Sequence, residues 1–340
     1  MPWRPESDGA VTQRPAGPPR AMILGCAGET LSDAERRFFA KANPLGFILF
    51  KRNVKDPDQV RALVRALRET VADAAAPVLI DQEGGRVQRL GPPHWPARPA
   101  AAVFARMFRE DPAGADRELS RNVAAIAADL AGLGITVDCW PVLDLPQADA
   151  DPIIGDRAFG SDPAGIAALA ALVISGLERG GVTPVIKHIP GHGRATVDSH
   201  LALPVVTADL ETLRATDFLP FRLLNGAPWA MTAHVVYTAV DPDNCATFSA
   251  KVIEDVIRGD IGFDGLLISD DLSMKALAGG FAERTQRALQ AGCDVVLHCN
   301  GDMAEMAPVA DAAHIMSEAA LDRFARGEAA RRAARDEETA

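Results

Sequence analysis

The amino-acid sequence predicts an α/β fold, a single-domain (β/α)8 barrel of the TIM type. The main observation is that eight short apolar runs alternate with longer amphipathic segments. Each run is apolar along nearly its whole length, which is typical of parallel strands buried on both faces. Eight strand–helix units close naturally into a barrel. The expected strands are Ala21–Gly25, Gly46–Phe50, Pro77–Asp81, Ile135–Cys139, Thr183–Lys187, Trp229–His234, Leu266–Asp270 and Asp294–His298.

Helix signals fill the segments between these runs. Ser32 and Glu35 have the spacing of a capping box, in which each side chain bonds the other residue's backbone N–H. Asp56-Pro57 and Asp162-Pro163 each offer an N-cap followed by a proline in the first turn. Ser249 precedes an apolar helical pattern in the same way. These signals predict helices after the first, second, fourth and sixth strands.

One domain accounts for most of the chain. An open doubly wound sheet is the alternative, but the first strand–helix turn, Gly25-Cys26-Ala27-Gly28, lacks the full dinucleotide fingerprint. Residues 1–20 are rich in Pro, Gly and polar residues, which predicts a flexible N-terminal tail. We expect the catalytic barrel over residues 21–325, and a final helix over about the last twenty residues that frays into a C-terminal tail over residues 326–340.

The composition excludes several classes of protein. The 340 residues are 48% hydrophobic and 24% charged, unlike disordered chains, collagens or disulfide scaffolds. The 46 acidic and 35 basic residues give a net charge of −11, which argues against a nucleic-acid partner. Five cysteines without a C-x-x-C pair fit a reducing compartment. Because we find neither a signal peptide nor a membrane span, we expect a cytoplasmic protein without a membrane partner.

Polar residues collect after the apolar runs, at the edge where barrel enzymes place their active sites. The third run ends in Asp81, the region after the fourth reaches Asp144, and the fifth leads into Lys187-His188. The sixth closes with His234 and the seventh with Asp270-Asp271. Strand side chains alternate, so these two aspartates point in opposite directions. Asp270 shares a face with the barrel interior and points to the pocket, whereas Asp271 can cap a helix starting near Leu272.

Other kinds of site are weaker interpretations. Metal-dependent barrels use closely spaced imidazoles, often H-x-H on one strand, whereas His188 and His192 are separated by Pro190-Gly191. We therefore expect no metal and no cofactor. No serine stands on a G-x-S-x-G turn. His192 and His298 can each be explained more simply as core histidines whose hydrogen bonds are satisfied. Glu83 can be explained as a residue that orders the glycine turn after it.

One motif is long and specific. Residues 187–193 read KHIPGHG, and Asp198-Ser199-His200 follows after four more residues. This pattern resembles the signature of the β-N-acetylhexosaminidases of glycoside hydrolase family 3. One departure is Arg194, where relatives often carry an acidic residue. The resemblance extends over residues 20–320, and its other matching segments are DQEGGRVQR at 81–89, GDRAF at 155–159 and ISDDLSM at 268–274.

The resemblance implies a role for each matching residue. Asp270 is the expected nucleophile, and His200 is the expected general acid/base with Asp198 as its partner. Imidazole titrates near neutrality, so one histidine can donate a proton and later accept one. The expected sugar-binding residues are Asp81, Arg89, Arg157, Lys187 and His188.

The implied activity is that of an exo-acting retaining β-N-acetylglucosaminidase. The resemblance to single-domain enzymes of cell-wall recycling implies release of terminal N-acetylglucosamine from peptidoglycan fragments, through a covalent glycosyl-aspartate. A carbohydrate is then the expected partner, and we expect a monomer. The alternatives are an N-acetylglucosamine phosphorylase or a β-glucosidase on the same barrel. A non-enzymatic binding module is disfavoured because Asp270, Asp198 and His200 are all present.

Overall fold

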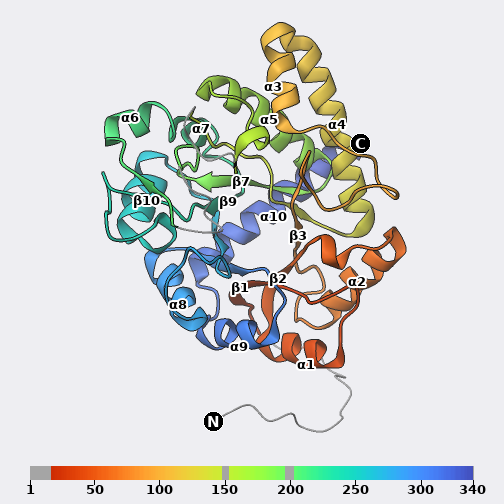
Figure 1. Ribbon diagram of the computed structural model, residues 1–340. Helices are drawn as coiled ribbons and strands as arrows, with labels where there is room; N and C mark the ends of the chain where they lie inside the picture. The colour runs from red at the N-terminus through yellow and green to blue at the C-terminus, as the bar shows by residue number, and fades with distance from the viewer. Residues whose placement is uncertain (1–16, 148–152, 196–202, 340) are drawn as a thin grey trace.

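Eight parallel strands close into a barrel at the centre of the molecule (Figure 1). The computed structural model describes residues 17–147, 153–195 and 203–339. The strands follow the order β1-β12-β11-β9-β7-β6-β3-β2 around the barrel, which confirms the predicted (β/α)8 fold. Each observed strand overlaps one expected run. Their bounds are β1 Arg20–Gly25, β2 Pro44–Leu49, β3 Val78–Ile80, β6 Val137–Asp138, β7 Thr183–Ile189, β9 Trp229–Thr232, β11 Leu266–Asp271 and β12 Val295–His298.

Helices surround the barrel (Figure 1). The predicted capping box is confirmed at α1, and the Asp56 and Asp162 side chains cap α2 and α5. The segment after Ser249 is a helix, but it winds as a π-helix over Val252–Asp260. The α-helices are α1 Asp33–Ala42, α2 Pro57–Glu69, α3 Ala101–Glu110, α4 Pro112–Leu133, α5 Pro163–Arg179, α6 Leu210–Ala215, α7 Leu219–Leu223, α8 Phe281–Ala291, α9 Met303–Ala312 and α10 Glu318–Thr339.

Two small sheets lie outside the barrel. An antiparallel hairpin, β4 Gln82–Gly84 with β5 Val87–Gln88, follows β3 directly. A parallel pair joins β8 Val205–Val206 to β10 Val236–Tyr237, which follows β9. Because both β4 and β10 continue from the carboxyl ends of barrel strands, these sheets build up the rim at that end.

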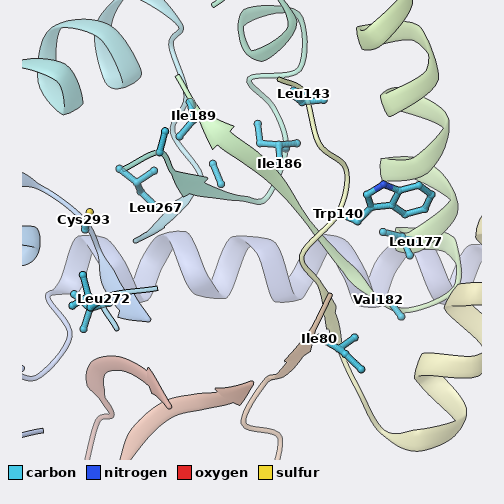
Figure 2. Close-up of a cluster of buried hydrophobic side chains, with 14 of the residues drawn as sticks. Ile80, Trp140, Leu143, Leu177, Val182, Ile186, Ile189, Leu267, Leu272 and Cys293 are labelled. Atoms are coloured by element: carbon cyan, nitrogen blue, oxygen red, sulfur yellow. The ribbon is translucent and has the colours of Figure 1, made fainter. Parts of the chain in front are cut away.

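The core has two layers, as expected for strands buried on both faces. Alternate residues of β11 illustrate this, since Leu266 and Ile268 belong to the cluster inside the barrel. Leu267 belongs instead to the larger cluster between strands and helices. Figure 2 shows part of that larger cluster, with Leu267 and Ile186 among its labelled side chains. This alternation places Asp270 on the same face as the barrel interior.

Helix α10 covers the amino end of the barrel. Arg323 donates to Asp294, which precedes β12, over 2.8 Å, and Phe324 packs against Trp229 with 6.1 Å between ring centroids. The helix continues through the expected tail, with Glu328 and Arg331 buried and paired at 2.7 Å. The expected boundary between barrel and tail, at residue 326, therefore lies within α10, and these contacts hold the later part of the helix against the barrel. Of the expected N-terminal tail, residues 1–16 lie outside the described part.

Two features bear on the environment of the chain. Among the helices of the described residues, none is both long and apolar enough to cross a membrane. All five cysteines are buried free thiols. The cysteines therefore contribute to packing rather than to cross-links.

Candidate active site

A cavity of about 260 Å³ opens at the carboxyl ends of the barrel strands. Six of the eight residues predicted for the site line it, and they come from different strands and loops. The cavity also contacts Asp271, His192 and apolar side chains such as Phe50 and Met231. The six predicted residues that line the cavity are Asp81, Arg89, Arg157, Lys187, His188 and Asp270.

Five of the charged side chains form one chain of alternating charges. Arg157 donates to both oxygens of Glu83 over 2.8 Å. The Lys187 ammonium lies 2.7 Å from Glu83 and 2.9 Å from Asp81. Arg89 closes the chain by donating to the other oxygen of Asp81 over 2.7 Å. Three cations thus alternate with two carboxylates beside the cavity.

These contacts keep every member of the chain charged. Burial opposes the charge of Asp81, but Lys187 and Arg89 outweigh it and hold the pKa of this carboxyl below its usual value. The pKa of Glu83 is lowered in the same way, against burial, by Arg157 and Lys187. For Lys187 burial acts in the opposite direction, and the two carboxylates raise its pKa above the usual value. Lys187 therefore stays protonated, and Asp81 and Glu83 stay ionised, at neutral pH.

The chain of charges also leaves hydrogen-bonding capacity for a ligand. Lys187 has three N–H donors, and two of them are used by the carboxylates. Each oxygen of Asp81 accepts one bond from a cation and can accept another from a hydroxyl group. Fixed donors and acceptors at one rim suit a ligand that carries several hydroxyl groups.

Glu83 belongs to this site, although its position in the sequence suggested only that it orders the glycine turn after it. In the structure its side chain is only 2% exposed and connects Arg157 to Lys187. Its partners lie 74 and 104 residues away along the chain. Its place two residues after Asp81, just past the carboxyl end of the third strand, was the one local signal for this role.

Asp144 organises the loop that follows β7. One of its oxygens accepts the backbone N–H groups of His188 and His192, at 3.1 and 2.7 Å. The other lies 2.7 Å from Nδ1 of His188. Burial raises the pKa of Asp144, but His188 outweighs it, and the pKa falls to about 2. An ionised Asp144 requires Nδ1 of His188 to donate, which leaves Nε2 as the ring atom for a ligand.

The Lys187–His188 peptide bond is cis, and both side chains line the cavity. His192 lies beside them, with 5.6 Å between its ring centroid and that of His188. Its two ring nitrogens are buried, and no partner for them is found among the described residues. Burial and the neighbouring His188 lower the pKa of His192 to about 4. His192 is therefore a neutral imidazole in the wall of the cavity.

The two adjacent aspartates at the end of β11 have different surroundings. Asp271 binds the backbone N–H groups of Ser273 and Cys299 through one oxygen and the Ser273 hydroxyl through the other. It holds a turn rather than a helix cap, because the next helix, α8, begins only at Phe281. One oxygen of Asp270 accepts the N–H of Asp271 over 2.8 Å. Both aspartates line the cavity, although strand alternation predicts that they point in opposite directions, and both accept backbone N–H groups.

The other two predicted catalytic residues, Asp198 and His200, lie outside the described residues. The structure does describe Arg194, the departure within the motif. Arg194 donates to the buried carboxylate of Asp217 over 2.6 Å and to Thr216 over 3.1 Å. An arginine at this position is thus explained by a local ion pair.

Comparison with known proteins places the chain in one family. Residues 22–328 match the model of the glycosyl hydrolase family 3 N-terminal domain. A β-hexosaminidase from Alkalilimnicola ehrlichii is 42% identical over 82% of this chain and 80% of its own length. Another β-hexosaminidase, from Aromatoleum aromaticum, is 38% identical over 87% of this chain and 82% of its own length.

Solved structures agree with this family. NagZ from Neisseria gonorrhoeae, in complex with N-trifluoroacetyl-D-glucosamine, superimposes with a TM-score of 0.84 at 32% identity, over 94% of each chain. A β-N-acetylhexosaminidase from Beutenbergia cavernae gives 0.75 at 28% identity, over 94% of this chain and 96% of its own. The chain therefore belongs to glycosyl hydrolase family 3, among its β-hexosaminidases, and is a glycoside hydrolase.

Proposed function

We propose that the protein is an exo-acting, retaining β-N-acetylglucosaminidase with Asp270 as its nucleophile. The observation that carries the proposal is that Asp270 shares one small cavity with the chain of alternating charges. The cavity lies at the carboxyl rim, where (β/α)8 enzymes bind their substrates. Its volume is slightly below the range of about 300–1,000 Å³ that is usual for small-molecule pockets, which favours a single terminal sugar.

The polar groups of the cavity suit a neutral sugar ring. Asp81 can accept hydrogen bonds from hydroxyl groups, while Lys187, Arg89 and Arg157 donate. Such contacts give directional recognition without a large apolar pocket. The gonococcal relative was crystallised with an N-acylated glucosamine, which supports the same class of ligand here.

The proposed reaction has two steps. In the first, a carboxylate oxygen of Asp270 attacks the anomeric carbon, the bond to the leaving oxygen breaks, and His200 gives that oxygen a proton. In the second, His200 removes a proton from water, which attacks the same carbon and releases the sugar from Asp270. Asp198 orients the His200 ring and stabilises its charged form. The roles of His200 and Asp198 rest on the sequence resemblance.

The finer part of the proposal is the natural substrate. We infer that it is a peptidoglycan fragment with a terminal N-acetylglucosamine, cleaved in the cytoplasm by a monomeric enzyme. This part rests on the resemblance to cell-wall-recycling enzymes and on the single barrel shared with the NagZ structures.

The activity is tested by chromophore release from aryl β-glycosides of N-acetylglucosamine and of glucose. We expect the N-acetylglucosaminide to be hydrolysed with a much higher kcat/KM. Free N-acetylglucosamine should form at the same rate with and without inorganic phosphate. A preference for the glucoside would indicate a β-glucosidase, and a sugar phosphate formed only with phosphate would indicate a phosphorylase.

A second experiment separates two candidate acid/base histidines. His188 with Asp144 is also a carboxylate–imidazole pair, and it lines the cavity. Substituting His200→Ala should slow substrates with poor leaving groups most, because those need protonation, and should spare activated aryl glycosides. His188→Asn should raise KM to a similar extent for substrates with poor leaving groups and for activated aryl glycosides. The reverse pattern would assign the acid/base role to His188.

A further inference from the structure

A closed ring of hydrogen bonds lies beneath the dipeptide that carries the proposed nucleophile. It begins at the backbone N–H of Asp270, which lies 3.3 Å from the hydroxyl of Thr232. The Thr232 and Thr247 hydroxyl oxygens are 2.8 Å apart, and that of Thr247 is 2.7 Å from Nδ1 of His234. Nε2 of His234 lies 3.0 Å from the carbonyl oxygen of Asp271. The ring therefore starts and ends on adjacent residues of β11.

The chemistry of the groups fixes the direction of each bond. A carbonyl oxygen can only accept, so Nε2 of His234 must carry a proton. Burial lowers the pKa of His234 despite the nearby Asp270, so the ring is neutral and Nδ1 is an acceptor. Thr247 must then donate to Nδ1, and Thr232 must donate to Thr247. The Thr232 oxygen is left to accept the N–H of Asp270, so each proton in the ring is donated once.

The residues of this ring are buried and come from separate parts of the fold. Thr232 ends β9, His234 follows it, and Thr247 lies in a short 3-10 helix over Ala246–Phe248. The side chains of these three are fully buried. Hydrogen bonds in such a closed, dry arrangement reinforce one another, and the loss of one member leaves its neighbours without partners.

We propose that His234, Thr247 and Thr232 are positioning residues, which fix the Asp270–Asp271 backbone so that the Asp270 carboxylate is held toward the bound sugar. This inference rests on the proposed role of Asp270. The ring acts through the backbone and adds no positive charge to the carboxylate.

The test uses the substitution Thr247→Val, which keeps the shape of the side chain and removes the hydroxyl. We expect kcat on an aryl N-acetylglucosaminide to fall by up to about 100-fold, because a small displacement of a reacting group is costly. KM should stay near the wild-type value, since Asp81 and Lys187 lie on other strands. Thr247→Ser keeps the hydroxyl and should restore most of the loss.

A matched control separates positioning from general stability. Thr70 is buried and its hydroxyl donates to Leu67 over 2.6 Å, in a helix end outside the cavity. Thr70→Val should lower the melting temperature while its kcat remains that of the wild type. Equal kcat values for Thr247→Val and Thr70→Val would overturn the inference. The proposed function itself would still stand if the wild type releases N-acetylglucosamine.

Nitrogen NMR of the wild-type protein gives a check that does not depend on the kinetics of any variant. With ¹⁵N-labelled histidine, and the His234 signals identified by their loss in His234→Gln, we expect a neutral ring with its proton on Nε2. A proton on Nδ1 would require the Thr247 hydroxyl to turn to the carbonyl of Ala233, at 3.2 Å. That result would break the ring of hydrogen bonds and overturn the inference.

Discussion

The two ends of the barrel both hold buried ion pairs, but these are arranged for different tasks. At the amino end, Asp294 accepts from Arg258 and from the backbone of Leu267, both over 2.9 Å, and from Arg323 over 2.8 Å. Helix α10 lies over this end and supplies Arg323. The acceptors of Asp294 are thus filled from within the protein, which is the pattern of a structural site.

At the carboxyl end, the ion pairs border an open cavity. Arg157, Glu83, Lys187, Asp81 and Arg89 alternate in charge, with one cation more than the carboxylates. Lys187 keeps a donor in reserve, and Asp81 keeps acceptor capacity. Burial and pairing alone therefore do not distinguish a structural from a functional network of ion pairs. What distinguishes the functional network is hydrogen-bonding capacity that remains unused beside a cavity.

The largest expected difference comes from removing one aspartate at each end. Asp270→Ala should lower kcat by about 10⁴-fold or more, because the covalent step loses its nucleophile, and the melting temperature should stay close to the wild-type value. Asp294→Ala should instead destabilise the fold by about 1–3 kcal/mol, because the half-buried Arg258 loses its carboxylate and the Leu267 N–H loses its acceptor, whereas Arg323 keeps Asp264 as a partner. Activity assays and thermal unfolding measure the two effects. If Asp294→Ala folds but loses activity, the ion pairs at the amino end are not purely structural, which would contradict the proposed difference between the two ends.

A smaller difference is expected from removing one cation at each end. Lys187→Met leaves Asp81 and Glu83 facing each other in a buried position, so kcat/KM should fall by about 100-fold or more. Arg323→Met leaves Asp294 paired with Arg258, so only about 1 kcal/mol of unfolding free energy should be lost. Wild-type kcat/KM in Lys187→Met would show that the chain of alternating charges does not bind the substrate.

A further expected difference is a pH dependence of stability at the carboxyl end. The pKa of His192 is about 4 in the folded state, below its usual value of 6.5, so the unfolded chain binds more protons between these pH values. Stability should be complete above pH 6.5 and fall toward pH 4, by about 3 kcal/mol in total. His192→Gln should flatten this slope in denaturant titrations.

The control for this prediction is His314, an exposed histidine whose carbonyl oxygen bonds the start of β1 at the amino end. His314→Gln should keep the slope of the wild type between pH 4 and pH 6.5. An unchanged slope in His192→Gln would mean that another group takes up the proton.

Much of the fold was predictable because its signals are local. Each barrel strand is an apolar run of a few residues, and the caps at Ser32, Asp56 and Asp162 are defined within four residues. The carboxyl ends of parallel strands meet at one rim, so Asp81, Lys187 and Asp270 could be expected near each other. That the end of α10 is held against the barrel could not be expected, because this depends on distant contacts such as that of Arg331 with Gly181, over 3.0 Å.

The rest of the site depends on contacts between residues that are far apart in the sequence and therefore could not be predicted from it. Asp144 was visible after the fourth strand, but its bonds to His188 and His192 follow only from the folded loop. Thr247 carries no motif at all, and its role depends on its 2.7 Å contact with His234. The assignments of Asp198 and His200 remain predictions from the motif.

The central claim is that Asp270 forms a covalent bond with the sugar. The most direct measurement is to incubate the wild-type enzyme with a slow 5-fluoro N-acetylglucosaminyl substrate and to map the labelled peptide by mass spectrometry. We predict one glycosyl ester, located on Asp270. A label on Asp271 would contradict the proposal that Asp270, and not its neighbour, is the nucleophile. The absence of any label, together with tight inhibition by a thiazoline analogue, would instead indicate attack by the substrate's own acetamido group.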